Sequence, residues 1–214
     1  MRITSDWLIR AKKEWEQAVE NGYKGIIFPI VQGHFSEDLR KQSAEFVSSL
    51  DMPGIAIGGL SVGEPHEEFV HFMNYTCQFL PEAKPKYVMG IGTPEYILDA
   101  VQAGIDMFDC VLPTRNARNG SYFTHKGMLS IKQERWTHDF GPIDSECNCK
   151  VCRTYSRSYL RHLFKEQEIL SCILASYHNL YFLQNMMYEI RAAINEDRFE
   201  QYRKEFLERF KEGV

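Results

Sequence analysis

Three cysteines lie within six positions of one another in the run Glu146-Cys-Asn-Cys-Lys-Val-Cys-Arg. Thiolate sulfur is a preferred ligand of Zn²⁺, and Cys147, Cys149 and Cys152 need only one further donor to close a tetrahedral site. His178, in an apolar stretch of expected helix, is the candidate for that donor. Four protein ligands leave no position open for water or substrate, so the sequence predicts one structural Zn²⁺ that constrains the fold around it.

The alternative is that these cysteines are free thiols and that His178 is a core histidine facing Leu174 and Leu183. A single Cys or His is usually explained in this way, because both residue types are often buried without binding a metal. The spacing argues against it, since a six-residue window does not easily supply three independent disulfide halves. Clustered cysteines and a start without an apolar leader favour a protein of the reducing cytoplasm.

Composition favours a globular chain with a real core. The 214 residues are 44% hydrophobic and 13% aromatic, which is enough for one large domain or one domain with an appendage. No apolar run of 18 residues is present, so we expect no membrane span.

Basic residues are concentrated locally, although the net charge is −4. Residues 111–135 contain five Lys or Arg and one acid, and residues 150–165 contain five more and no acid. Arg153, Arg157, Arg161 and Lys165 recur every four residues, which predicts one face of a helix. Such a row could hold a phosphate backbone, and the alternative is an ordinary solvated helix face.

Strand and helix signals alternate in the first half of the chain. The expected strands are residues 24–31, 53–57, 87–91 and 105–111. The expected helices are residues 5–20, 36–50, 65–80 and 93–104. Ser36 and the acids after it are typical of a helix start. Strands joined by crossover helices of this length are parallel, so we expect an α/β fold, either a doubly wound sheet or part of a barrel.

The alternation ends after Val111. Residues 121–133 alternate like a hairpin centred on Lys126-Gly127, and residues 168–195 and 197–211 are expected to be helices. We therefore divide the chain into residues 1–133, an α/β part that is either a doubly wound sheet or a partial barrel with catalytic strand ends, and residues 134–214, a zinc-binding subdomain with carboxyl-terminal helices.

Distinctive residues follow each expected strand, where parallel α/β folds collect their functional groups. They are Gln32-Gly33, Gly58-Gly59-Leu60, Met89-Gly90 and Asp109-Cys110. Glycines let the backbone approach a flat ligand closely, and the Gln32 amide could bind a heterocyclic base. Turn chemistry alone also accounts for Gly-Gly at a strand end.

Asp109 has two interpretations. A carboxylate after an apolar strand is either a helix cap or hydrogen-bond anchor, or a nucleophile, and composition does not decide between them. Arg115 and Arg118 follow closely and could hold phosphates. Beside them, Asp109 becomes a candidate for attack on the anomeric carbon of a ribose.

The motifs at these positions resemble those of the bacterial tRNA-guanine transglycosylase family, also called queuine tRNA-ribosyltransferases. The resemblance covers nearly the whole chain in order. The matching runs are Pro29-Ile-Val-Gln-Gly, Gly58-Gly-Leu-Ser-Val-Gly-Glu, Tyr87-Val-Met-Gly-Ile-Gly, Asp106-Met-Phe-Asp-Cys-Val-Leu-Pro-Thr-Arg-Asn-Ala-Arg-Asn-Gly and the cysteine cluster with His178.

This resemblance implies a (β/α)8 TIM barrel with a zinc-binding subdomain. The implied enzyme is a pentosyltransferase that exchanges the wobble guanine of tRNAs with GUN anticodons for a 7-deazaguanine, a queuosine precursor. Asp109 would be the catalytic nucleophile that forms a covalent ribosyl intermediate. Gln32, Gly58, Gly59, Leu60, Met89 and Gly90 would contact the base. Arg115, Asn116 and Arg118 would bind RNA, Cys147, Cys149, Cys152 and His178 would hold the zinc, and the family's homodimer is expected.

One departure from the family pattern affects this expectation. Family members carry roughly another half-barrel before the part that matches residue 5, in keeping with the eight strands of the fold. That half supplies an aspartate acid/base and a second aspartate that recognises the incoming base. We therefore expect a carboxyl-terminal portion of the enzyme with two open strand edges. The alternatives are a non-catalytic tRNA-binding partner subunit and an inactive fragment.

Overall fold

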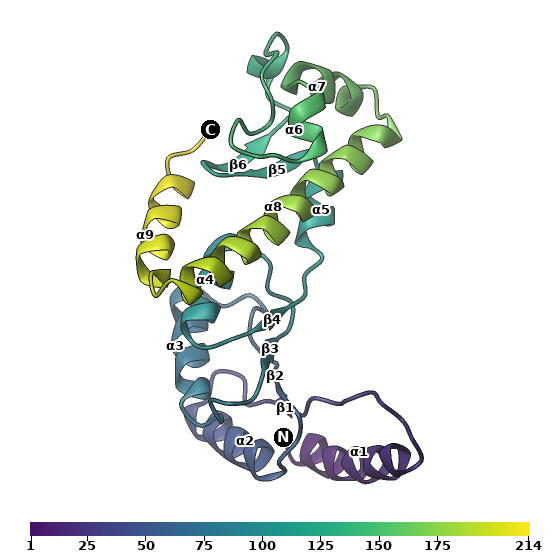
Figure 1. Cartoon of the computed structure of the whole chain (residues 1–214), viewed down its shortest axis with the longest axis vertical. Coiled ribbons are helices and arrows are strands. Elements are labelled where there is room, and N and C mark those ends of the chain that lie inside the picture. Colours follow the sequence, from purple (N-terminus) through teal and green to yellow (C-terminus); the bar gives the residue numbers. More distant parts are fainter. The chain divides into compact units, whose positions relative to one another are not determined.

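The computed structural model describes all 214 residues, which form two compact units, Met1–Cys110 and Val111–Val214. The first unit is built on one parallel sheet of four strands in the order β1-β2-β3-β4 (Figure 1). The strands are β1 (Ile30–Val31), β2 (Ile55–Ile57), β3 (Lys86–Val88) and β4 (Met107–Phe108). The helices that connect them are α2 (Glu37–Ser49), α3 (His66–Cys77) and α4 (Pro94–Gln102). The predicted α/β class with a parallel sheet is confirmed.

Local sequence accounts for these helices. The Ser36 side chain accepts a hydrogen bond from the N–H of Leu39, as expected of a helix cap. Pro94 lies in the first turn of α4, where its missing N–H costs no hydrogen bond. The helices bury apolar faces in the core of this unit, with Ala44 from α2, Phe69 from α3 and Leu98 from α4 fully covered.

All four strands are shorter than the sequence indicates, the two outer strands most of all. Residues 24–31 were expected as a strand, yet only Ile30–Val31 pairs, and of residues 105–111 only Met107–Phe108 pairs. Both strands are at an edge of the sheet, where β1 pairs only with β2 and β4 only with β3. The apolar runs are long enough for longer strands, but no second neighbour is present to extend the ladder. Open edges of this kind invite further pairing.

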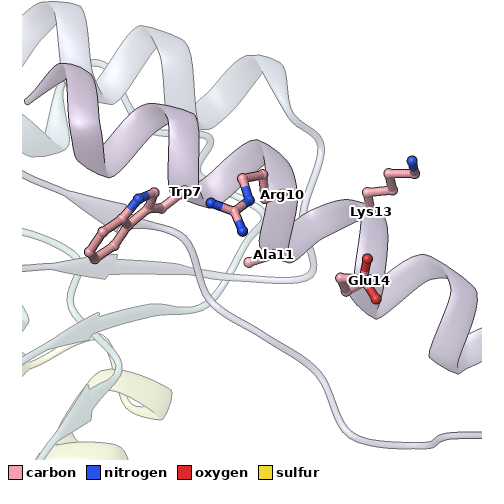
Figure 2. Close-up of a pocket in the computed structure, with 5 residues that line it drawn as sticks. All are labelled: Trp7, Arg10, Ala11, Lys13 and Glu14. Carbon is pink, nitrogen blue, oxygen red and sulfur yellow. The ribbon is translucent and has the colours of Figure 1, made fainter.

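Helix α1 (Arg2–Glu20) precedes the sheet and buries none of its residues. Trp15 lies on this helix, and its indole Nε1 donates to the carbonyl of Gly25 at 2.8 Å. Trp7 is 65% exposed on the same helix, although an indole usually lies at least partly in a core. An open hollow of about 720 Å³ is lined by Trp7, Arg10, Ala11, Lys13 and Glu14, whose side chains are drawn in Figure 2. Trp7 and Ala11 are therefore uncovered, whereas Leu8, Trp15 and Ala18 of the same helix are partly buried.

The second unit combines a hairpin with helices (Figure 1). Its elements are α5 (Leu112–Arg118), β5 (Ser121–Thr124), β6 (Gly127–Ser130), the 3₁₀ turn η1 (Glu134–Trp136), α6 (Lys150–Thr154), α7 (Arg157–Lys165), α8 (Ile169–Asn195) and α9 (Phe199–Phe210). The predicted hairpin is confirmed as antiparallel, and Tyr122, Leu129 and Ile131 enter the core of this unit. None of the helices has the length and apolar character needed to cross a membrane.

Along the chain, the boundary between the two compact units lies after residue 110, whereas the domain boundary predicted from the sequence lies after residue 133. The hairpin accounts for the difference, because β5 packs against α8 of the second unit. The division into a partial barrel and a zinc-binding subdomain stays a prediction.

The predicted row of four basic residues on one helix is wrong. Helix α6 ends at Thr154 and α7 begins at Arg157, because Tyr155 is extended and the Ser156 side chain caps a new helix. Arg157 is also occupied within the protein: Nη1 donates to Asp139 Oδ2 at 3.0 Å, and Nη2 donates to the Ile143 carbonyl at 3.1 Å. It therefore supports the fold instead of forming a free phosphate-binding face.

Candidate active site and metal centre

Asp109 follows β4 and is exposed, with one carboxylate oxygen held in place. The Tyr87 hydroxyl donates to Asp109 Oδ1 at 2.6 Å, and the backbone N–H of Gly90 donates to the same oxygen at 2.9 Å. The hydrogen bond from Tyr87 has the largest effect, and together the two bonds hold the pKa of the Asp109 carboxyl below its ordinary value. The side chain is thus an ionised carboxylate at neutral pH, as a nucleophile must be.

Gln32 and the pair Gly58-Gly59 are brought together at the ends of β1 and β2. A Cβ atom on Gly58 would lie 3.2 Å from Gln32 Nε2, and one on Gly59 would lie 3.2 Å from Gln32 Oε1. Gly59 also has φ of +69°, which a side chain would strain. The glycines therefore leave the room that the Gln32 amide occupies.

The remaining expected base contacts differ in exposure. The Leu60 side chain is 5% exposed and belongs to the core, so only its backbone could meet a ligand. Met89 is 39% exposed and directly precedes Gly90, whose N–H is bound to Asp109. Met89 is thus available at the same strand end.

Sequence reasoning missed four residues that shape these strand ends. Tyr87 could have been found from the parallel register, since Tyr87 pairs with Met107 and Asp109 lies two positions further on the same face. The Ser43 hydroxyl accepts from Gln32 N at 2.9 Å, and the Glu64 carboxylate accepts from the N–H groups of residues 61–63. Arg40 is fully buried beneath the same loops. Ser43 and Arg40 come from α2, and only the fold brings them to the strand ends.

The four expected metal ligands of the second unit converge. All four ligand atoms lie within 4.8 Å of one another, and His178 is fully buried. His178 Nδ1 is 3.9 Å from the sulfur of Cys147, 3.4 Å from that of Cys149 and 3.3 Å from that of Cys152. Zinc bonds of about 2.3 Å to sulfur and 2.0 Å to nitrogen at tetrahedral angles separate the two donors by about 3.5 Å. This cluster could hold a metal ion, and its dimensions and donor set fit Zn²⁺.

Outer contacts orient the cluster for a metal. His178 Nε2 is 2.7 Å from the carbonyl oxygen of Phe123, so Nε2 carries the proton that it donates and Nδ1 is the nitrogen that faces the sulfurs. The orientation of the imidazole therefore suits a cation at the centre.

Asn179, the residue after His178, secures the helix that carries this ligand. Its side-chain oxygen accepts from Phe123 N at 3.0 Å, and its Nδ2 donates to the carbonyls of Pro113 and Ser121 at 2.9 and 3.0 Å. One fully buried amide thereby links α8 to α5 and to β5, the strand whose carbonyl orients His178.

The residues expected to bind RNA lie on α5. Arg115 and Arg118 are exposed, and Asn116 is partly buried. They belong to the second unit, whereas Asp109 and the expected base contacts belong to the first. Exposed guanidinium groups on a short helix suit contact with phosphate oxygens.

Comparison with known proteins identifies the family. A sequence model of the queuine tRNA-ribosyltransferase family matches residues 1–212. The chain belongs to this family. Among relatives named queuine tRNA-ribosyltransferase, that of Treponema denticola is 54% identical over 210 residues, which is 98% of this chain and 55% of the relative. That of Caldanaerobacter subterraneus is 49% identical over 98% of the chain and 55% of the relative.

A third relative gives the same proportions. The queuine tRNA-ribosyltransferase of Borrelia hermsii is 49% identical over 211 residues, or 99% of this chain and 56% of the relative. The chain spans about half the length of the curated relatives that it matches. The expected family membership is confirmed over nearly the whole chain.

Proposed function

We propose that this chain is the nucleophile-bearing portion of a tRNA-guanine transglycosylase, a pentosyltransferase that exchanges the wobble guanine of tRNAs with GUN anticodons for a 7-deazaguanine. The observation that carries the proposal is the geometry of Asp109. Its carboxylate is exposed after β4, kept ionised, and fixed through one oxygen by Tyr87 and Gly90. A carboxylate that was only a structural anchor would not need to be exposed at a strand end.

The proposed reaction uses the second carboxylate oxygen of Asp109, Oδ2, because Tyr87 and Gly90 both bind Oδ1. Asp109 Oδ2 attacks C1′ of the ribose while the bond from C1′ to N9 of guanine breaks, and guanine leaves with the bonding electrons and then takes up a proton. An incoming 7-deazaguanine loses a proton at N9, attacks C1′ and displaces the carboxylate. Two displacements retain the configuration at C1′, as in retaining glycosidases. The family resemblance assigns the proton donor to the preceding half-barrel.

The base would be held at the ends of β1, β2 and β3. The Gln32 amide can donate to and accept from a purine edge, and the backbone at Gly58, Gly59 and Leu60 offers further polar groups. Met89 and Gly90 would cover the ring beside the nucleophile. The close fit of Gln32 against the two glycines supports this arrangement.

RNA contacts and zinc complete the proposal. Arg115, Asn116 and Arg118 would bind backbone phosphates of the anticodon loop, since all three lie on α5 and the two arginines, three positions apart, are exposed. One Zn²⁺ would be held by the cluster of Cys147, Cys149, Cys152 and His178, where it would brace the fold and do no chemistry. The complete protein would form a (β/α)8 barrel with a zinc-binding subdomain, and would act as a homodimer.

The test is covalent capture of tRNA. The protein, expressed from its complete reading frame, is incubated with tRNA of GUN anticodon and analysed on a denaturing gel. We expect a protein–tRNA adduct that guanine discharges, together with incorporation of labelled guanine into the tRNA. tRNA binding without an adduct or incorporation would instead identify a non-catalytic tRNA-binding subunit.

A further inference from the structure

A buried arginine ties together the loops that follow β1 and β2. Arg40, in the first turns of α2, is fully buried. Its Nε donates to the carbonyl of His34 at 2.8 Å, Nη1 to that of Gly58 at 2.9 Å and Nη2 to that of Gly59 at 3.0 Å. Burial lowers the pKa of Arg40 to about 10, so the group stays charged at neutral pH. One guanidinium thus serves three carbonyls from two loops.

The sheet does not hold these loops in place. The pairing of β1 with β2 ends at Val31 and Ile57, with a last bond from Gly58 N to the Val31 carbonyl. Beyond this point the backbone leaves the extended conformation: φ is +134° at Gly33, +51° at His34 and +69° at Gly59. Glycine adopts such angles readily, whereas the left-handed conformation of His34, whose carbonyl Arg40 binds, persists only where its surroundings fix it. Arg40 is the side chain that bonds to both loops at this point.

The same loops carry the proposed base contacts. Gln32 is the first residue of the loop that follows β1. Its side-chain amide lies close to Gly58 and Gly59, and Arg40 donates to the carbonyls of both glycines. A Cβ atom on Gly59 would lie 3.2 Å from Gln32 Oε1 and 3.5 Å from Arg40 Nη2, so the amide and the guanidinium are both close to this glycine. Loss of the Arg40 side chain would therefore affect the position of the Gln32 amide through Gly59, which is close to both.

We propose that Arg40 is a positioning residue for the base pocket: its guanidinium fixes the spacing between the Gln32 loop and the Gly58–Leu60 backbone, and so preorganises the groups that bind the base. This inference rests on the proposed function for the nature of the ligand. A lysine cannot replace the arginine fully, because an ammonium lacks the planar fork that serves three acceptors at once.

The experiment compares Arg40→Met and Arg40→Lys with Lys41→Met, which removes an exposed cation from the next position of the same helix. In the protein expressed from its complete reading frame, KM and kcat are measured for guanine exchange, with KM for tRNA as a second substrate. Amide hydrogen exchange of residues 32–36 and 58–63 is measured in the same variants.

We expect Arg40→Met to raise KM for guanine at least about tenfold, with kcat and KM for tRNA within threefold of the parent, because the lost interactions serve binding of the base. Arg40→Lys should be intermediate, Lys41→Met should equal the parent, and exchange in both loops should accelerate in the Arg40 variants alone. Arg40→Lys keeps a cation in the site. If Arg40→Met does not fold, KM for guanine and amide exchange in Arg40→Lys test the proposal.

Two results would overturn the proposal. One is a fall in kcat with KM for guanine unchanged, which describes a loss of folded enzyme and not a loose pocket. The other is unaltered amide exchange of both loops in Arg40→Lys. A parent protein that exchanges no guanine contradicts the proposed function instead, and loop exchange then still reports whether Arg40 holds the loops.

Discussion

The hydroxyl of Tyr87 donates to Oδ1 of Asp109 at 2.6 Å, and the two residues come from adjacent parallel strands. Tyr87 pairs with Met107, two positions before Asp109, so the two side chains lie on the same face of neighbouring strands. The bond fixes one oxygen of the carboxylate and leaves the other for chemistry. It also favours the ionised form, because a donated hydrogen bond stabilises the negative charge.

Replacing Tyr87 by Phe should raise the pKa of Asp109 toward its ordinary value, because the largest cause of the lowered pKa is removed. The ionised carboxylate is lost as pH falls through the pKa of the folded protein, so the acid limb of kcat/KM should move to higher pH. The measurement is a pH profile together with NMR titration of the Asp109 carboxyl carbon. Tyr23→Phe, at an exposed tyrosine, is the control, and a profile that Tyr87→Phe leaves in place would refute the role of this bond.

Replacing Asp109 by Asn should abolish the covalent adduct with tRNA and lower guanine exchange at least about 10³-fold, because an amide oxygen is a poor nucleophile. Denaturing electrophoresis detects the adduct. Asp106→Asn is the matched control, since Asp106 Oδ2 accepts from Lys86 N at 2.7 Å and an amide oxygen can accept the same bond. An adduct that persists in Asp109→Asn would assign the attack to another residue.

Replacing Cys149 by Ala should lower bound zinc from about one ion per chain to almost none and unfold residues 147–178, because structural zinc binding and local folding are coupled. Metal content by mass spectrometry and protease sensitivity of this segment are the measurements. Cys172→Ala is the control, as Cys172 lies on α8 outside the cluster. Equal zinc content in Cys149→Ala and the parent would exclude this metal site.

Replacing Asn179 by Ala should lower the free energy of unfolding of the second unit by about 3 kcal/mol. The substitution removes three hydrogen bonds and takes this partner from the N–H of Phe123 in the core, and an unsatisfied buried group costs about 1–3 kcal/mol. Urea unfolding followed by circular dichroism measures the change. Asn185→Ala on the same helix, which removes only a bond to Glu189 one turn away, should cost less than about 1 kcal/mol. Similar losses in both variants would contradict the role assigned to Asn179.

Periodicity and capping signals predicted the elements well where the cause is local. Ser36 and Pro94 mark helix starts that the structure confirms. The four-residue repeat that begins at Arg153 failed, because the Ser156 cap divides the segment and Asp139 and Ile143 bind Arg157. Repeat spacing predicts a shared face only when the helix is continuous, and it carries no information about partners elsewhere in the chain.

The sequence by itself determined the parallel α/β class, the family, the order of the strand-end residues and the identity of the four clustered residues that could hold a metal ion. These follow from local spacing, from helix capping and from motifs that are contiguous along the chain. Tertiary structure alone decided that Tyr87 holds Asp109, that Phe123 orients His178 and that Arg40 supports the loops around Gln32. The physical reason is that hydrogen bonds between segments 6 to 55 residues apart depend on strand register and helix packing, which no short stretch of sequence encodes.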